Sequence, residues 1–154
     1  MTKFTSDNSV ELPSIPSQLL ELALTDLERA EKSPDHTVNM GVWMRIEDRT
    51  CNVCLAGSVM AFSLDVALSA KGFEVSPNEL DTRSKNLIES LDYFRTGSLY
   101  SASIRLARAD TDPKMVKTVR AIGYRPTPDY DRADPDPFKA SMRDLISVLK
   151  AAGA

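Results

Sequence analysis

The stretch from Trp43 to Leu68 constrains the fold of this chain more than any other. It holds the only tryptophan, both cysteines and a long run without a charged residue, Cys51 to Leu64. A helix made of these residues is apolar on nearly every side, and such a helix has to be buried inside a domain. The sequence therefore predicts a buried central helix over residues 51–70, with Thr50 as its N-cap.

Small side chains share one face of this predicted central helix. They are Cys54, Gly57, Ser58 and Ala61. A small face lets another backbone approach closely, which is the usual reason for a helix to carry a glycine that costs about 1 kcal/mol. One hypothesis is therefore a homo-oligomeric structural or interaction module, with this face buried between two copies of the chain.

Helical periodicity and capping residues recur along the rest of the chain. They predict helices over residues 17–32, 99–109, 113–122 and 138–152, and one that is capped at Asp81, Thr82 or Ser84 and ends near Phe94. Residues 38–46 alternate loosely and predict one short extended or β segment. The fold class is mainly α: a flexible tail over residues 1–15, then a single compact domain of about six helices over residues 16–154.

Length and charge exclude several classes of protein. A chain of 154 residues buries enough surface to fold without a metal or a disulfide. A net charge of -3 argues against a nucleic-acid partner held by phosphate neutralisation. The N-terminal residues lack the apolar core of a signal peptide, and the uncharged run is too short to span a bilayer. We therefore expect a cytoplasmic protein with no membrane partner.

The pair Cys51 and Cys54 is the first candidate for chemistry. A thiol at a helix N-terminus has a lowered pKa, so a redox protein or a cysteine enzyme is an alternative function. His36, the only histidine, would have to serve as the base. However, a thioredoxin-like motif belongs to an α/β pattern, and a zinc site needs about four ligands. Two buried structural thiols and no metal site are the favoured interpretation.

Arginines are the second candidate, because guanidinium groups bind phosphate and carboxylate in a bidentate manner. Trp43, Arg45 and Arg49 come just before the predicted central helix, whose N-terminus favours anions. Arg105 and Arg108 lie three residues apart on another predicted helix, and Tyr124 offers an aromatic plane. These six residues are the predicted binding site for an anionic ligand such as a nucleotide.

Several motifs of enzymes are absent. The sequence contains no phosphate-binding glycine loop, no H-E-x-x-H and no G-x-S-x-G. The aspartates between residues 129 and 136 lack the glycine and glutamate of a calcium loop. The sequence leaves open whether the protein is an enzyme, favours a non-enzymatic binding protein, and implies no cofactor.

The segment Trp43-x-Arg45, followed by the run Cys51-Asn52-Val53-Cys54-Leu55-Ala56-Gly57, resembles a pattern in small accessory proteins of tailed phages and prophages. The resemblance covers roughly twenty residues. It implies a context rather than a residue role: such proteins often bind host proteins or immune signalling molecules without catalysis. We therefore expect an anti-defence factor that sequesters a small anionic ligand or binds a host protein.

Overall fold

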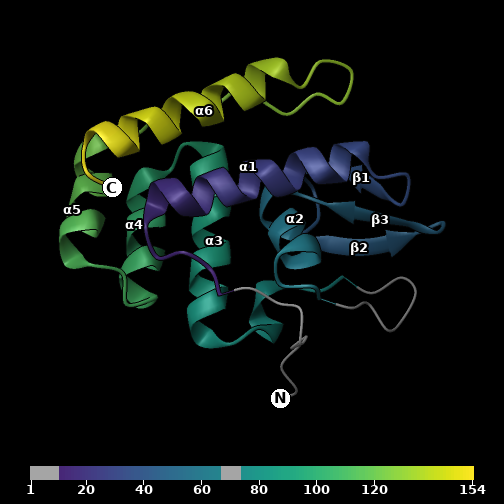
Figure 1. The fold of residues 1–154 in the computed structure, drawn as a ribbon, viewed down its shortest axis with the longest axis horizontal. Coiled ribbons are helices and arrows are strands. Elements are labelled where there is room, and N and C mark those ends of the chain that lie inside the picture. The colour runs from purple at the N-terminus through teal and green to yellow at the C-terminus, as the bar shows by residue number, and fades with distance from the viewer. Residues whose placement is uncertain (1–10, 67–73) are drawn as a thin grey trace.

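Helix α1 (Pro16–Lys32) runs through the middle of the fold, and α2, α3, α6 and the strand β1 all contact it. Figure 1 shows this arrangement in a computed structural model that describes residues 11–66 and 74–154. The apolar stripe predicted for this helix is confirmed, since each of its members is buried: Leu20, Ala23, Leu24, Leu27 and Ala30. The helix begins at Pro16, one residue before the predicted start at Ser17.

A three-stranded sheet lies at one end of the molecule (Figure 1). Its strands are β1 (His36–Val38), β2 (Met44–Glu47) and β3 (Thr50–Val53), in the order β1-β3-β2. The central strand β3 is parallel to β1 and antiparallel to β2. Strands β2 and β3 form a hairpin whose two turn residues, Asp48 and Arg49, have φ angles of 47° and 68°. Positive φ at both positions matches the right-handed twist of a hairpin.

The strand β3 corrects the start of the predicted central helix. Residues 51–53 are extended and paired on both sides, and Thr50 begins the strand instead of capping a helix. Helix α2 is shorter than predicted and covers Leu55–Phe62, with Cys54 as its N-cap. Residues 67–70 of the prediction lie outside the described residues. A strand paired on both sides is buried throughout, so its apolar run has no period that distinguishes it from a buried helix.

Gly57 on α2 sits directly against the backbone of Trp43. A β-carbon at Gly57 would lie 1.6 Å from the carbonyl oxygen of Trp43. The same oxygen accepts a hydrogen bond from the backbone N–H of Cys54 over 3.3 Å. The small face of this helix therefore packs within the chain, which removes the observation behind the proposed packing of two copies at this face.

The remaining helices confirm the mainly α prediction. They are α3 (Thr82–Thr96), α4 (Leu99–Arg108), α5 (Pro113–Ile122) and α6 (Asp136–Ala151), with a short 3₁₀ turn, η1 (Pro77–Glu79), before them. Two helices are capped by the aspartate that precedes them. Asp81 accepts a hydrogen bond from the backbone N–H of Ser84, and Asp112 accepts one from the backbone N–H of Lys114. Gly97 ends α3 with a left-handed φ of 84°.

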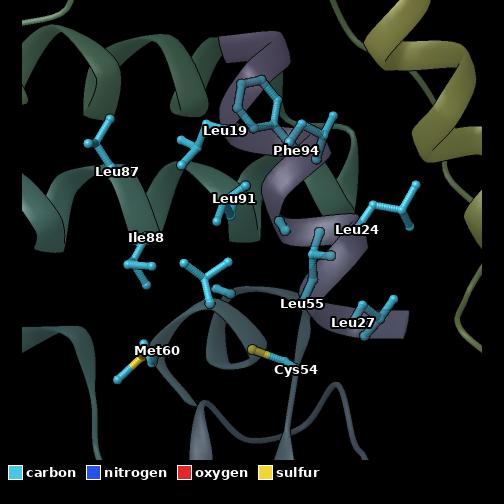
Figure 2. Close-up of a cluster of buried hydrophobic side chains, with 14 of the residues drawn as sticks. Leu19, Leu24, Leu27, Cys54, Leu55, Met60, Leu87, Ile88, Leu91 and Phe94 are labelled. Carbon is cyan, nitrogen blue, oxygen red and sulfur yellow. The ribbon is translucent and has the colours of Figure 1, made fainter. Parts of the chain in front are cut away.

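The hydrophobic core lies between α1, α2 and α3 (Figure 2). Leucines of α1 and α3 meet Leu55 and Met60 of α2 there, all fully buried or nearly so. The core also reaches a residue of the predicted tail: Leu12 is 2% exposed, and its carbonyl oxygen accepts a hydrogen bond from Arg83 over 2.9 Å. Residues 1–10 of the predicted tail lie outside the described residues. Within the described part of the chain, no helix is long and apolar enough to cross a membrane.

The contact at Gly57 predicts a large loss of stability in the variant Gly57→Ala. The added methyl group would overlap a backbone oxygen, which cannot rotate away, so we expect the free energy of unfolding to fall by roughly 2 kcal/mol or more. Urea unfolding measures the loss. Gly41→Ala is the matched control, because a β-carbon there meets only the side chain of Asn39, at 3.2 Å. Equal stability of the two variants would contradict the packing of α2 against β2.

Candidate functional site

Helices α4 and α5 form an antiparallel hairpin at the end of the molecule opposite the sheet (Figure 1). The turn between them contains Asp110 at a φ of 61°, and Asp112 then caps α5. The end of α4 is fixed to α3, because the side-chain amide of Asn86 donates a hydrogen bond to the carbonyl oxygen of Arg108 over 3.1 Å. Helix α5 makes its main contact with α4 alone, and Val119 is its only buried residue.

A groove of about 590 Å³ lies between these two helices, and we call it the α4–α5 groove. Its floor and walls are formed by Ser103, Ile104, Ala107, Thr111, Pro113 and Val116. Its cationic rim consists of Arg108, Lys117 and Arg120. Most of the lining surface is therefore hydrocarbon, with positive charge at the edge. This volume lies in the usual range for small-molecule sites, which combine an apolar lining with a few polar groups.

Most arginines of the described structure form an ion pair with a carboxylate, but the cations of the rim do not. Among the described residues, neither Arg108 nor Lys117 has an ion-pair partner, and both are exposed. The guanidinium group of Arg120 lies 4.6 Å from the centre of the Tyr100 ring, in a cation–π contact. Three positive charges thus border one apolar groove without a carboxylate to neutralise them in the described structure.

Thr111 adds a polar group in the lining of the groove. The residue is 4% exposed, and its hydroxyl oxygen is buried without a hydrogen-bond partner among the described residues. A buried hydroxyl that makes no hydrogen bond loses the free energy that water would supply, roughly 1–3 kcal/mol. This oxygen has almost no exposed surface, so a ligand in the groove does not reach it directly.

Two aromatic side chains stand near one end of the groove. Tyr100 is 59% exposed and Tyr124 is 72% exposed. The first lies under the guanidinium group of Arg120, and the second approaches Gly97, where α3 turns into α4. Tyrosine and arginine are the residue types that protein interfaces favour.

The six residues predicted as one site lie in two separate places. Arg105, Arg108 and Tyr124 belong to the α4–α5 end, whereas Trp43, Arg45 and Arg49 belong to the sheet at the opposite end (Figure 1). Only Arg108 borders the groove. Arg105 points to α3 instead, where its guanidinium nitrogen lies 2.8 Å from a carboxylate oxygen of Glu89, in an ion pair without hydrogen-bond alignment.

The geometry of the sheet removes the helix N-terminus from the predicted anion site before α2. Arg45 lies on β2 and pairs with Glu47 over 2.7 Å, and Arg49 is an exposed turn residue. The backbone N–H of Trp43 donates a hydrogen bond to a carboxylate oxygen of Glu74 over 2.7 Å. The strand β3 separates these residues from α2 in sequence. The N-terminus of α2 is itself buried, and the thiol of Cys54 caps it by accepting from the N–H of Gly57 over 3.3 Å.

Both cysteines are free, buried thiols. Burial raises the pKa of Cys51, and burial raises the pKa of Cys54 to about 11. His36 is the register partner of Cys51 in the sheet, so the two lie on neighbouring strands. The imidazole Nδ1 is occupied by a 2.7 Å hydrogen bond with the Ser33 hydroxyl, however, and no hydrogen bond joins it to the Cys51 thiol. This environment favours the thiol form and opposes a cysteine nucleophile.

Residues 11–66 and 74–154 contain no group of three or more histidine, cysteine, aspartate or glutamate side chains that could hold a metal ion. Comparison of the chain with models of protein families, with curated proteins and with solved structures finds no match. The site therefore has to be interpreted from its own geometry.

Sequence reasoning missed Lys117, Thr111 and the apolar floor of the groove. The sequence of α5 contains a pattern that predicts a cationic surface: basic residues recur every three positions, with no acidic residue between them. They are Lys114, Lys117 and Arg120. A helix with one cationic side and no acids presents a positive face.

The burial of the thiols predicts very slow alkylation in the folded protein. The thiolate is the reactive species, and the raised pKa of Cys54, about 11, keeps that cysteine protonated even at pH 9. We expect neither cysteine to react with iodoacetamide within minutes at pH 7 to 9, and both to react after unfolding in urea, as followed by intact mass. Fast labelling of the folded protein at pH 6 would instead support the redox alternative.

Proposed function

We propose that this chain is a non-enzymatic binding protein whose α4–α5 groove holds a small anion with an apolar body. The observation that carries the proposal is the combination of a hydrocarbon floor with the rim of Arg108, Lys117 and Arg120. Apolar surface supplies the affinity of such a site, and a few charged groups orient the ligand.

Local charge supports an anionic ligand although the chain as a whole is acidic. The net charge is -3. Many basic side chains are neutralised within the fold, as Arg95 is by Asp92 at 2.6 Å and Lys139 by Glu31 at 2.9 Å. Exposed charges act mainly over a Debye length of about 8 Å at physiological salt, so the potential inside the groove depends on the three cations of the rim and on the two aspartates of the adjoining turn, Asp110 and Asp112.

The residues of the groove favour binding without catalysis. Its lining contains no histidine, cysteine, aspartate or glutamate that could act as a general base or nucleophile. The Ser103 hydroxyl is already used, since it donates to the carbonyl oxygen of Tyr100 over 2.7 Å. A bound anion would therefore meet charge and hydrocarbon, without an activated group.

Sequestration is the biological form of this function that we propose. The likeness to phage accessory proteins supports a factor that removes a small anionic signal of the host, and a nucleotide is one such anion. A host protein is the second candidate. It is favoured by the exposed Tyr100 and Tyr124 beside the groove, because exposed tyrosines next to arginine are typical of protein-binding surfaces.

The dye anilinonaphthalene sulfonate tests the groove, because it joins an apolar body to one anionic group. We expect it to fluoresce when mixed with the folded protein, and we expect Arg108→Gln and Lys117→Gln each to weaken its binding about ten-fold, since each removes a charge-assisted contact. Ala107→Trp should abolish binding by filling the exposed part of the groove. Titration of the dye against each variant measures the dissociation constants.

Two matched variants control for charge and bulk elsewhere. Lys114→Gln removes a charge from the same helix at a residue that does not line the groove, and Ala140→Trp adds bulk at an exposed position of α6. Both should bind the dye as the wild type does. If the groove variants and the controls bind equally, the α4–α5 groove is not the binding site.

A further inference from the structure

The floor of the α4–α5 groove is aliphatic, and this restricts the kind of apolar body that fits it. Its carbon surface comes from Ile104, Ala107, Pro113 and Val116. The only neutral polar side chains are those of Ser103, whose hydroxyl already has a backbone partner, and of Thr111, whose hydroxyl oxygen is almost inaccessible. The lining contains no aromatic ring, asparagine or glutamine.

A nucleobase suits this floor poorly. Each base carries several donors and acceptors on its edges, and proteins usually read them with side-chain amides, backbone groups or charges while stacking the ring on an aromatic residue. On this aliphatic floor the donors and acceptors of a base would lose their hydrogen bonds to water and gain none from the protein. That cost opposes binding. An alkyl chain has no donors or acceptors, so it gives up no hydrogen bonds to water when it enters the groove.

The cations give the groove a direction. Arg108 lies at the turn between the two helices, and Lys117 lies one helical turn beyond Pro113. Both are free of ion pairs in the described part of the chain. Arg120 lies at the other end, where its guanidinium group is placed over Tyr100. The seven-residue step from Pro113 to Arg120 corresponds to about 10 Å along the helix.

We propose that the ligand is an aliphatic chain that ends in a single anionic group, such as a medium-chain alkyl carboxylate. The head group binds Arg108 and Lys117, and the chain lies on Ile104, Ala107 and Val116 toward Tyr100. This inference rests on the proposed function, and it narrows that function from anions in general to alkyl anions. The methylene stems of Lys117 and Arg120 extend the apolar walls along the chain.

If the ligand is an alkyl anion, its affinity for the groove should depend on the length of its alkyl chain. Each methylene that leaves water for a hydrocarbon surface should tighten binding by up to about four-fold. The gain should continue until the chain fills a groove of about 10 Å and then stop. A site built for a nucleobase would show no such regular gain.

The experiment is displacement of anilinonaphthalene sulfonate by butanoate, hexanoate, octanoate and decanoate, with octanol and adenosine monophosphate in parallel. We expect the affinity of the carboxylates to rise with length, octanoate to bind about ten-fold more tightly than octanol, and adenosine monophosphate to displace least. An octyl sulfate arm distinguishes a carboxylate head from a general anionic head.

Two sets of variants separate the head from the chain. Arg108→Gln should weaken every carboxylate by the same factor of about ten, while the gain per methylene and the affinity for octanol stay unchanged. The double variant Ile104→Thr with Val116→Thr keeps the volume of the floor similar but adds hydroxyl groups, so it should reduce the gain per methylene. Lys114→Gln is the control, and circular dichroism verifies that each variant is folded.

The outcomes distinguish this inference from the function on which it rests. If adenosine monophosphate displaces the dye better than every carboxylate, and Arg108→Gln weakens it, the alkyl assignment is overturned and the anion-binding groove stands. If chain length affects affinity but neither set of variants changes it, the chain binds elsewhere and the assignment is also overturned. If the dye itself is insensitive to the groove variants, both proposals fail.

Discussion

The close approach of α2 to the backbone of Trp43 is the contact on which the rest of the fold depends. Gly57 leaves no space for a side chain there, and Cys54 donates its backbone N–H to the same carbonyl oxygen. The hairpin β2–β3 and the helix α2 therefore form one rigid unit. Helices α1 and α3 pack against α2 and bury Leu55 and the thiol of Cys54 (Figure 2). This explains why the most apolar stretch of the chain is a scaffold.

The candidate site lies where the fold covers its elements least. Helix α1 contacts several neighbours, whereas α5 depends on α4 for its main contact. Met115 and Val116 of α5 are consequently only half-buried, although their spacing would suit a core face. An apolar surface that the chain itself leaves partly open is available to a ligand. Ligand-binding elements are commonly drawn from such weakly packed parts of a protein, because they must admit another molecule.

Much of this fold can be predicted from sequence, because five of the six described helices have an apolar side and a polar side, and two of them, α3 and α5, also have an aspartate cap. The structure places α1 and α5 within about one residue of their expected bounds. The prediction fails between Thr50 and Phe62 for a physical reason: β3 and most of α2 are buried on every face, including the polar residues Asn52 and Ser58. The spacing of apolar residues cannot distinguish a helix from a strand when no side of the element faces solvent. The turn at Asp48 and Arg49 also lacks the glycine or asparagine that normally announces a hairpin.

The α4–α5 groove is harder to predict than the fold, because arginines are visible in a sequence but their partners are not. Arg105 and Arg108 are neighbours on one helix, yet α3 supplies Glu89 to the first and no acid to the second. That difference arises only from the packing of two helices. The same argument applies to net charge: several of the acids that make the chain negative pair with basic side chains far from α5. An acidic protein can therefore contain a basic groove, provided that its ion pairs form elsewhere.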